Sequence, residues 1–458
     1  MKITPKFYNT ASRTVEEFKQ TEELVKIYTC GPTVYNYQHI GNFMAYVYWD
    51  VLIRMFHALD IKTKRLMNIT DVGHLTSDAD EGEDKMEKGA RAANKTVWEI
   101  ADFYTNDFLE HFHKLNLIEP DKTARATNYI DASMAIVDRL TEKGYTYETS
   151  DGIYYDTSKF PRYADFARLD LKGLEAGKRV GFNNEKKSVS DFALWKFVRE
   201  GEKHDMQWEY LGRPGYPGWH IECVAITLAE LGESIDIHTG GIEHIPVHHT
   251  NEIAEVEPLT DKPLSRFWLH NNHVKIDGEK ISKSLGNVIL LPDLLANGFN
   301  YMDFKMWVLE GHYQKERNFT WEGLEAAKSR LANWRKYASF RHQGEALAQD
   351  ANEDDAIRKI KEAVADNLST QRALTEVDYY HSVVTSEPFW QAIDDLLGLN
   401  IVESTPPLTK EQQALLDARY VARTIKDFAE SDRLRDELLS DGIAILDGAS
   451  GLQTWYHA

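Results

Sequence analysis

The sequence predicts an α/β protein in which a parallel, Rossmann-like sheet is interrupted by an insertion and followed by a helical bundle and a small C-terminal domain. Three observations support this prediction. Residues 22–70 read as strand, helix and strand. Residues 92–205 mix helical and strand-like pieces before dense glycine, histidine and apolar content resumes. From residue 303 to about residue 380 the pattern is helical. At roughly 150 residues per domain, the 458-residue chain has room for about three domains.

The first strand–helix–strand unit places candidate ligands at one edge of the sheet. An apolar run ends at Cys30, a turn-rich loop follows, and residues 39–60 carry apolar side chains at helical spacing. The segment KTKRLMNIT then reads as a second strand. A helix between two strands indicates a right-handed crossover and a parallel sheet. Ligands of such sheets bind at the carboxyl ends of the strands, so Cys30 and His39 are expected beside a ligand.

The later segments divide the chain further. GIYYDTSKF reads as a short strand and turn, and Leu324, Ala327, Leu331 and Trp334 form one apolar helical stripe of a bundle. STPPLTKEQQ reads as a linker before a pair of charged helices. The predicted divisions are 1–120 and 206–265 for the two halves of the sheet domain, 121–205 for a connective insertion, 266–312 for a region with a lysine-bearing loop, 313–398 for the bundle, and 400–458 for the C-terminal domain.

Composition excludes several classes of protein. The chain is 42% hydrophobic and 28% charged, with a formal net charge of −20. This balance predicts solubility and argues against global adhesion to nucleic acid or membrane, although a local basic surface stays possible. The longest stretch free of charged residues, 27–49, is too polar to span a bilayer. The N-terminus lacks the apolar region of a signal peptide, so the expected compartment is the cytoplasm. The acidic run 78–88 is expected to be solvated.

Four residues could form a zinc site. The chain has only two cysteines, Cys30 and Cys223, so disulfides are not its scaffold. His248 and Glu252 are four apart in a plausible helix and so share one face. Zinc accepts thiolate, imidazole and carboxylate ligands in one tetrahedral shell. Taken singly, a buried cysteine is usually a small apolar residue, and a His–Glu pair is often a surface hydrogen bond. His249 competes with His248, and spacing does not decide between them.

Two loops could bind phosphate. QHIGN lies between the first strand and its helix, where backbone N–H groups and the helix dipole attract anions. His39 and Asn42 could donate hydrogen bonds there, and Gly41 allows close approach. DGEKISKSLGN offers Lys280 and Lys283 for closure over a polyphosphate, although a basic surface turn is the simpler reading. The Walker pattern is absent. A third loop, HTGGIEH, contributes the glycines Gly240 and Gly241.

Together these segments resemble the class I aminoacyl-tRNA synthetases, and within them the cysteinyl-tRNA synthetase family. HIGN (39–42) and KISKS (280–284) resemble the two motifs of the class, and YTCGPTVYNYQHIGN, PGWHIEC and HHTNEIAE resemble segments of the cysteine-specific family. DNLSTQRAL and the C-terminal helices resemble its bundle and anticodon-binding end. The resemblance implies one Zn²⁺ per subunit that binds the substrate thiolate, with these ligands: Cys30, Cys223, His248 and Glu252.

The resemblance also implies a reaction. L-cysteine and ATP would form cysteinyl-adenylate and pyrophosphate, and cysteine would then pass to the 3′ end of tRNA(Cys), with Mg²⁺ accompanying ATP and the chain acting as a monomer. Residues 266–312 would contact the tRNA stem and 400–458 the anticodon. The implied catalytic residues are His39, Asn42, Lys280 and Lys283; ATP would also contact Gly41, Gly240 and Gly241; the cysteine pocket would be lined by Thr70, Trp219 and His238.

Some positions depart from the family pattern. Ile281 stands for a methionine, Thr239 for a glycine and Thr250 for a glutamate, and the paired-aspartate run after Thr70 is replaced. None of these changes removes an implied ligand or catalytic residue. Arg423, Lys426, Arg433 and Arg435 are expected to supply part of a basic strip for RNA, with a solvated helix face as the simpler reading.

Two alternatives to this reading remain. One is a ligase that joins cysteine to an amino-sugar, which would need no anticodon-binding domain. The other is a non-catalytic, zinc-containing tRNA-binding paralogue. Residues 400–458 argue against the first, and the intact His39, Asn42, Lys280 and Lys283 argue against the second.

Overall fold

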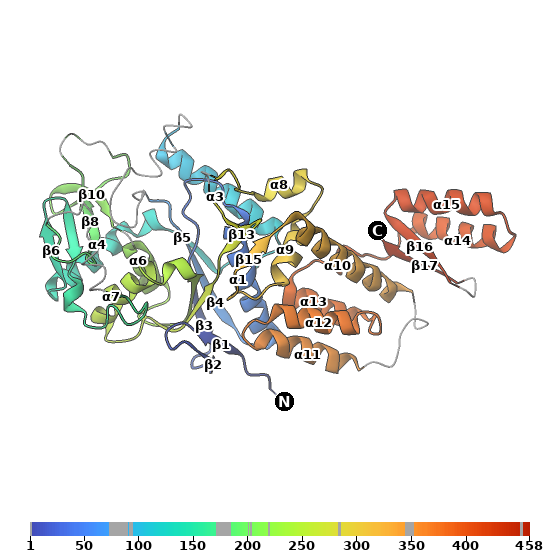
Figure 1. Ribbon diagram of the computed structural model, residues 1–458, viewed down its shortest axis with the longest axis horizontal. Coiled ribbons are helices and arrows are strands. Elements are labelled where there is room, and N and C mark those ends of the chain that lie inside the picture. Colours follow the sequence, from blue (N-terminus) through green and yellow to red (C-terminus); the bar gives the residue numbers. More distant parts are fainter. Residues whose placement is uncertain are drawn as a thin grey trace.

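A computed structural model of the chain describes residues 2–72, 90, 95–170, 185–199, 201, 204–218, 220–282, 285–343, 352–448 and 452–458. The acidic run 78–88, Trp219 and Lys283 lie outside the described residues. Figure 1 shows a central α/β body flanked by the insertion at one end, with the C-terminal helices projecting at the other. Within the described part, no helix combines the length and apolarity that crossing a membrane requires.

The predicted parallel sheet is confirmed. Its five strands lie in the order β12 (Ser265–Asn271), β11 (Ile235–Gly241), β3 (Val25–Thr29), β4 (Thr63–Ile69) and β5 (Lys122–Arg125). Every neighbouring pair in this sheet runs parallel. The chain starts the sheet at β3, builds outward through β4 and β5, and returns on the other side of β3 with β11 and β12. The point at which the strand order reverses therefore lies between β3 and β11, where sheets of this type bind ligands.

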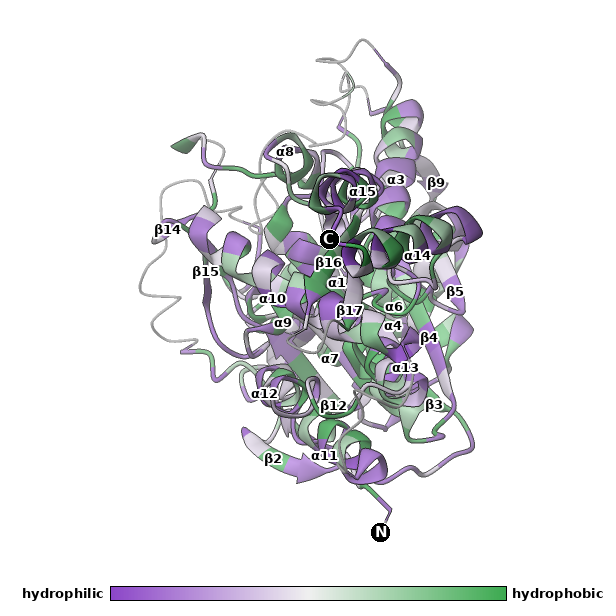
Figure 2. Cartoon of the chain, turned by 90° about the vertical axis from the view of Figure 1, so that its right-hand side faces the viewer, coloured by the Kyte–Doolittle hydropathy of each residue, from purple (hydrophilic) through white to green (hydrophobic). Residues whose placement is uncertain are grey.

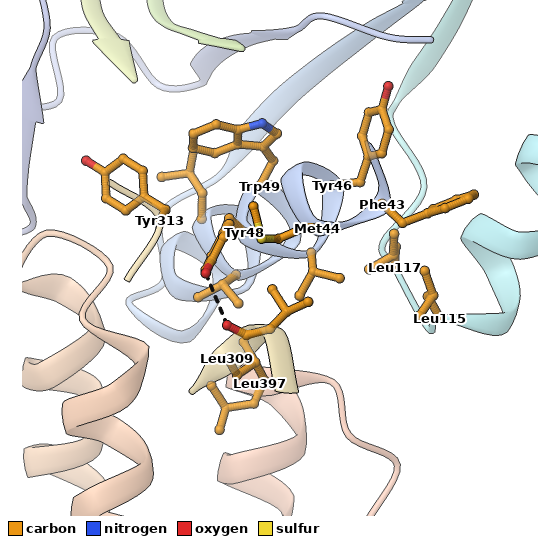
Figure 3. Packing of buried hydrophobic residues seen from close by; sticks show 14 of the residues in the cluster. Phe43, Met44, Tyr46, Tyr48, Trp49, Leu115, Leu117, Leu309, Tyr313 and Leu397 are labelled. Atoms are coloured by element: carbon orange, nitrogen blue, oxygen red, sulfur yellow. Dashed lines mark hydrogen bonds between the residues drawn. The ribbon is translucent and has the colours of Figure 1, made fainter. Parts of the chain in front are cut away.

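Helix α1 (Ile40–Ala58) connects β3 to β4 through the interior of the protein. Its side chains are buried on nearly every side, as expected for a helix that is apolar all round. Figure 3 shows Tyr48 of α1 directed toward Leu309, while Tyr46 and Trp49 point to the opposite side of the helix. Leu115, Leu309 and Leu397 belong to the same buried cluster and come from segments distant in the sequence. The hydroxyl of Tyr48 donates to the carbonyl of Val308 at 3.1 Å. This helix is therefore the common packing partner of the sheet domain and the C-terminal bundle.

Among the described residues, the insertion contains its own antiparallel sheet and one α-helix, α4 (Ile130–Glu142). The strands are β6 (Thr146–Thr149), β7 (Gly152–Tyr155), β8 (Phe192–Phe197), β10 (Arg213–Pro217) and β9 (Trp208–Tyr210), in that spatial order. Helix α3 (Val97–Lys114) precedes β5, and α4 follows it.

The boundaries of the insertion differ from the predicted 121 and 205. β5 pairs with β4 and so belongs to the parallel sheet, while β9 and β10 pair with β8 and so extend the insertion to residue 217. The difference arises because hydrogen-bond pairing between strands, which composition does not reveal, decides where each strand belongs. β12 likewise extends the parallel sheet to residue 271, beyond the predicted limit of 265.

The segments around the second half of the sheet domain complete the ligand-bearing edge. Helix α6 (Ile221–Glu230) precedes β11, and the predicted helix after residue 247 is confirmed as α7 (His248–Thr260). β13 (Val274–Ile276), β14 (Glu279–Lys280) and β15 (Arg317–Phe319) form a small sheet. In sequence, α8 (Leu291–Ala296) and α9 (Tyr301–Leu309) lie between β14 and β15. A hairpin of β1 (Lys6–Asn9) and β2 (Thr14–Glu17), which the sequence did not predict, lies beside β12.

The predicted helical bundle is confirmed as α10 (Trp321–Ser339), α11 (Glu353–Ala365), α12 (Thr370–Tyr380) and α13 (Glu387–Leu397). The apolar stripe expected on α10 is buried at all four positions. α14 (Lys410–Thr424) and α15 (Phe428–Ser440) confirm the predicted helix pair, and both carry hydrophobic as well as hydrophilic residues in Figure 2. The predicted linker STPPLTKEQQ is shorter than expected, because Thr409 caps α14 and its last four residues are helical. An unpredicted hairpin, β16 (Ile443–Asp447) and β17 (Gln453–His457), packs against them.

A buried cluster of charges joins α1 to the segments that follow it. The Asp50 carboxylate lies 2.7 Å from the Arg54 guanidinium and 3.0 Å from the Lys305 ammonium, with Asp50 and Lys305 fully buried. Lys305 also donates to the carbonyls of Leu115 and Asn116 at 3.0 and 2.9 Å. Burial lowers the pKa of Lys305 to about 8, although the Asp50 charge opposes that shift. The cluster therefore depends on each charge keeping its partners.

We expect Lys305→Met to lower the free energy of unfolding by about 3–5 kcal/mol, because removing one partner leaves the buried Asp50 carboxylate short of compensation. Denaturant unfolding followed by circular dichroism measures this loss. Lys62→Met removes an exposed ion pair with Glu23 instead, and should leave the unfolding midpoint close to that of the wild type. Equal midpoints for the two variants would show that the buried cluster does not stabilise the junction.

Candidate functional site

A cleft opens at the carboxyl ends of β3, β4 and β11, where the reversal of strand order predicts ligand binding. One cavity of about 360 Å³ is lined by the start of α1, by the end of β11 and by residues of the lysine-bearing loop. A second cavity of about 230 Å³ is lined by the ends of β3 and β4 and the starts of α6 and α7. The two cavities share the lining residues Cys30, Gly31, Thr33, Glu243 and His244. They therefore form one cleft with two chemically different ends.

The larger end is built on the N-terminus of α1. His39 is the N-cap of this helix: its Nδ1 accepts from the backbone N–H of Asn42 at 3.2 Å, and the Asn42 side chain accepts from the His39 N–H at 3.0 Å. Both residues and Gly41 line the cavity. A Cβ atom on Gly41 would lie 3.0–3.1 Å from the His39 ring and from Ile281. The backbone N–H groups and dipole of this helix end favour an anion.

The lysine-bearing loop reaches the same end of the cleft. Ile281 and Ser282 line the cavity, whereas Lys280 is exposed on β14 and does not. The segment after the loop is tied to α1, because the N–H of Ile40 donates to the carbonyl of Ile289 at 3.0 Å. The structure therefore brings the loop to the edge of the cavity, with Lys283 outside the described residues.

Two glycines at the end of β11 allow this close packing. A Cβ atom on Gly240 would lie 2.7 Å from both His244 Nδ1 and His249 Cε1, and one on Gly241 would lie 2.2 Å from a carboxylate oxygen of Glu243. Both glycines line the larger cavity. The preceding residue, Thr239, is fully buried, and its hydroxyl donates to the carbonyl of Tyr28 at 3.4 Å. Its side chain therefore faces a neighbouring strand and lines neither cavity.

The smaller end brings three of the four predicted metal ligands together. Cys30 Sγ lies 3.8 Å from His248 Nε2, which lies 3.1 Å from Glu252 Oε1. The ligand atoms of these three residues all lie within 4.8 Å of one another. Cys223 is buried and lines the same cavity but belongs to no such group among the described residues.

His249 lies close to the same sulfur. Its Nε2 is 3.3 Å from Cys30 Sγ, and it belongs to two further groups of possible ligands, one with Cys30 and His244 and one with His238 and Glu252. His249 is fully buried and lines neither cavity, whereas His248 lines the smaller one. A metal ion that also contacts a molecule in the cleft would therefore be bound by His248 and not by His249.

The electrostatics of this cluster suit a soft divalent cation. Burial, reinforced by nearby carboxylates, raises the pKa of Cys30 and of Cys223. Burial lowers the pKa of His244 to about 3 and also lowers that of His249, so both imidazoles are neutral. Burial would raise the pKa of Glu252, but its interactions with His238 and His248 lower it to about 2. Neutral imidazoles, a carboxylate and two thiols that a cation would deprotonate form a donor set that fits zinc.

Unpartnered atoms support the same interpretation. Nδ1 of His238 and Nδ1 of His244 are buried and have no hydrogen-bond partner within the described ranges. Buried polar atoms normally have such partners. These nitrogens leave lone pairs or N–H groups available at the cluster, which fits a site that holds a charged group.

The residues expected around the amino-acid pocket occupy different positions. Thr70 lines the smaller cavity and accepts a hydrogen bond from the side chain of Asn68 at 2.9 Å. His238 is fully buried, stacks on Trp268 with ring centroids 4.5 Å apart, and places its Nε2 2.8 Å from Glu252. Like Glu252, it lines neither cavity, so both side chains are buried beside the cleft and contact each other.

Sequence reasoning missed several residues that line the cleft, among them His220, Glu243 and His244. His220 precedes α6 with a φ of +81°, a left-handed conformation that is uncommon for a residue other than glycine. Its Nδ1 contacts Nδ1 of His248 closely. Such backbone conformations persist where the surrounding structure enforces them and cluster at functional sites. No spacing rule identifies these residues, because they meet the cluster only through the fold.

A parallel sheet with a cleft at the strand reversal, a helix start suited to an anion and a lysine-bearing loop fit a class I aminoacyl-tRNA synthetase. Residues 16–329 match the family described as the class I (C) tRNA synthetase catalytic domain, and residues 405–455 match the cysteinyl-tRNA ligase anticodon-binding domain. The chain therefore belongs to the cysteinyl-tRNA synthetase family.

Whole-chain comparisons agree with this assignment. The chain is 37% identical to cysteine–tRNA ligase of Treponema denticola, over 98% of this chain and 99% of that protein. It is 40% identical to cysteine–tRNA ligase 1 of Burkholderia lata, over 97% of this chain and 95% of that protein. The solved structure of Mycobacterium tuberculosis methionyl-tRNA synthetase with methionyl-adenylate shares the fold, with a TM-score of 0.58 at 16% identity, covering 82% of this chain and 89% of that one.

We expect Gly240→Ala to destabilise the protein by about 1–3 kcal/mol, the usual effect of overpacking, because its Cβ would press on the buried His249 ring. Gly41→Ala is the matched control. Its closest contacts are the side chains of His39 and Ile281, and alanine gains helix propensity at that position. Chemical denaturation of both variants measures the difference; equal stability of the two would mean that the end of β11 has free space.

Proposed function

We propose that this chain is a cysteine–tRNA ligase, which activates L-cysteine with ATP and transfers it to the 3′ end of tRNA(Cys). The observation that carries the proposal is the two-ended cleft. A helix N-terminus suited to phosphate lies at one end, a cluster of sulfur, imidazole and carboxylate groups lies at the other, and both are joined at Cys30. Relatives that match nearly the whole chain bear the name cysteine–tRNA ligase.

The smaller end would select the amino acid. Zn²⁺ would be held there by Cys30, Cys223, His248 and Glu252, and when bound it supplies a soft acceptor for the substrate thiolate. This matters because serine is nearly isosteric with cysteine, and a pocket without such chemistry separates similar side chains by only about a hundredfold. Thr70 and Trp219 would line the pocket. His238 would act on it through Glu252, which it contacts at 2.8 Å.

The larger end would hold ATP, accompanied by Mg²⁺. The cysteine carboxylate would attack the α-phosphate and release pyrophosphate, a step that needs no general base and depends on alignment and charge stabilisation. His39 and Asn42 would contact phosphate at the start of α1. Gly41, Gly240 and Gly241 would allow close approach of the nucleotide, and Lys280 and Lys283 would stabilise the pyrophosphate.

The C-terminal domain would bind the anticodon. Tyr420 and Phe428 are 55% and 62% exposed around the turn between α14 and α15, and exposed aromatic side chains suit stacking with unpaired bases. The predicted basic strip is partly neutralised, because Arg423 pairs with Asp447 and Arg433 pairs with Glu430. The match of residues 405–455 to the anticodon-binding family favours tRNA over an amino-sugar as acceptor. The monomeric state and the cytoplasmic location stay predictions.

The proposal is tested by cysteine-dependent ATP–pyrophosphate exchange, with serine as the control substrate, followed by transfer of labelled cysteine to tRNA(Cys). We expect exchange with cysteine and little with serine. Exchange without transfer would point to a different acceptor. Absence of exchange in a folded, zinc-loaded chain would contradict the proposed activity.

Cys223→Ser should abolish zinc retention and cysteine activation, because the variant loses a thiolate ligand and its hydroxyl is a poor donor to zinc. Metal analysis of the purified chain measures retention. If the variant keeps its zinc, then Cys30, His248 and Glu252 suffice to hold the ion and Cys223 has been wrongly assigned. Wild-type chain without zinc would overturn the metal site altogether.

Lys283→Ala should leave the zinc content unchanged and slow adenylate formation at least ~100-fold, the scale of losing one donor to a transition state. Lys275 provides a matched control, because it lies on β13, which pairs with β14, and forms an ion pair with Glu316 at 2.9 Å. Lys275→Ala should exchange pyrophosphate at the wild-type rate. Similar rates for both variants would remove the role assigned to Lys283.

A further inference from the structure

A chain of hydrogen-bonding groups runs from the interior to the sulfur of Cys30. The hydroxyl of Thr10 lies 2.7 Å from Nδ1 of His270, and Nε2 of His270 lies 2.7 Å from Nδ1 of His249. Nε2 of His249 completes the chain at 3.3 Å from Cys30 Sγ. The four groups come from distant parts of the sequence, since Thr10 follows β1, Cys30 follows β3, His249 is in α7 and His270 is in β12.

This row of hydrogen-bonded side chains is separated from the cleft. Thr10, His249 and His270 are 3%, 0% and 4% exposed, and none of them lines either cavity. Both ring nitrogens of His249 and of His270 contact another member of this row of hydrogen-bonded groups. The backbone N–H of Thr10 donates to the carbonyl of Trp268 at 2.9 Å, which fixes the threonine beside β12. These residues therefore act on a molecule in the cleft only through Cys30.

The chain has two self-consistent arrangements of its protons. A neutral imidazole carries one N–H and one lone pair, and burial favours the neutral form of both rings. If His249 donates to the sulfur, its Nδ1 must accept from His270, and Nδ1 of His270 must then accept from the Thr10 hydroxyl. In the reverse arrangement the Cys30 thiol donates to His249 and every bond points toward Thr10. The threonine hydroxyl can end the chain in both arrangements, because a hydroxyl donates and accepts.

Metal binding would select the first arrangement. A thiolate that binds a cation has no proton to donate and so requires donors around it. His248 is placed differently, since its Nε2 lies 3.1 Å from Glu252 and its ring lines the cavity. One histidine therefore faces the cleft beside a second ligand, and the other approaches the sulfur from the protein interior.

We propose that His249 is a positioning residue for Cys30 and not a metal ligand: together with His270 and Thr10 it donates a hydrogen bond to the sulfur, which orients the thiolate and stabilises it for the cation. This inference rests on the proposed function in one respect, namely that Cys30 binds zinc. It assigns a role to Thr10, which is remote from both the metal and the substrate. Partners of this kind typically change metal affinity 10–100-fold.

The hydroxyl of Thr10 provides the sharpest test, because Thr10→Val keeps the shape of the side chain and removes only its donor. Without that donor, His270 is free to carry its proton on Nδ1. Its Nε2 then accepts from His249, and a lone pair of His249 faces the sulfur in place of an N–H group. Thr10→Ser keeps the hydroxyl and is the matched rescue variant.

The experiment measures the zinc dissociation constant of the full-length chain at one fixed pH, by competition with a chromophoric chelator. Cobalt-substituted protein adds a second readout, the thiolate-to-cobalt charge-transfer band in the near ultraviolet. We expect Thr10→Val to weaken zinc binding at least ~10-fold and to shift the band, and Thr10→Ser to behave as the wild type. His249→Ala should retain one zinc ion per chain with affinity lowered ~10–100-fold, whereas His248→Ala should lose stoichiometric zinc.

The double variant Thr10→Val/His249→Ala distinguishes a linked chain from two separate structural effects. Since Thr10 acts through His249, the double variant should bind zinc as weakly as His249→Ala alone. Additive losses, or wild-type affinity and band in Thr10→Val, would overturn the proposal. Complete loss of zinc from His249→Ala with retention in His248→Ala would make His249 the ligand and also overturn it. A wild-type chain without zinc would overturn the proposed metal site first, and this inference with it.

Discussion

The parallel pairing of β3 with β11 is the constraint on which the candidate site depends. Ile27 pairs with Ile237 and Thr29 with Thr239, and the N–H of Cys30 then donates to the carbonyl of Thr239 at 3.1 Å. This register places Cys30 beside Gly240 and next to the start of α7, where its sulfur contacts His248 and His249. Because side chains alternate along a strand, a shift of one residue would turn each strand's side chains to the opposite face. The two ends of the cleft meet only because this register is kept.

Helix α1 extends that constraint to the rest of the molecule. Its N-terminus forms the anion-binding end of the cleft through His39 and Asn42. Further along, its Asp50 and Arg54 meet Lys305 of α9, and Arg54 also donates to the carbonyl of Asp394 in α13 at 3.3 Å. One helix therefore forms part of the larger end of the cleft and contacts the helical bundle that leads to the C-terminal domain. The position of the bundle is thereby fixed relative to the chemistry.

The cluster of possible metal ligands concentrates groups that are unfavourable to bury without compensation. Two thiols, a carboxylate and several imidazoles lie together, and burial shifts the pKa of both thiols and of His249 toward their uncharged forms. A buried polar group without a partner costs free energy. A divalent cation would offset that cost by accepting their lone pairs, and the chain from Thr10 to Cys30 would direct one more N–H group to the sulfur. The same low-dielectric surroundings strengthen each of these interactions.

The sequence by itself determined the local elements and the chemical inventory. Apolar spacing indicated β3, α1, β4 and the buried stripe of α10, since these patterns depend only on neighbouring residues. Motif resemblance identified the family and singled out Cys30, His248 and Glu252, which the structure brings together.

The tertiary structure alone decided which distant segments meet. It assigned β5 to the parallel sheet and β9 and β10 to the insertion, and it brought His238 into contact with Glu252. It also gave His248 and His249 different surroundings although they are adjacent in sequence. The reason is physical: adjacent residues on a helix point about 100° apart, and what lies on each side is set by strand pairing between segments more than 200 residues apart, such as Thr29 and Thr239. Local sequence carries no record of that pairing.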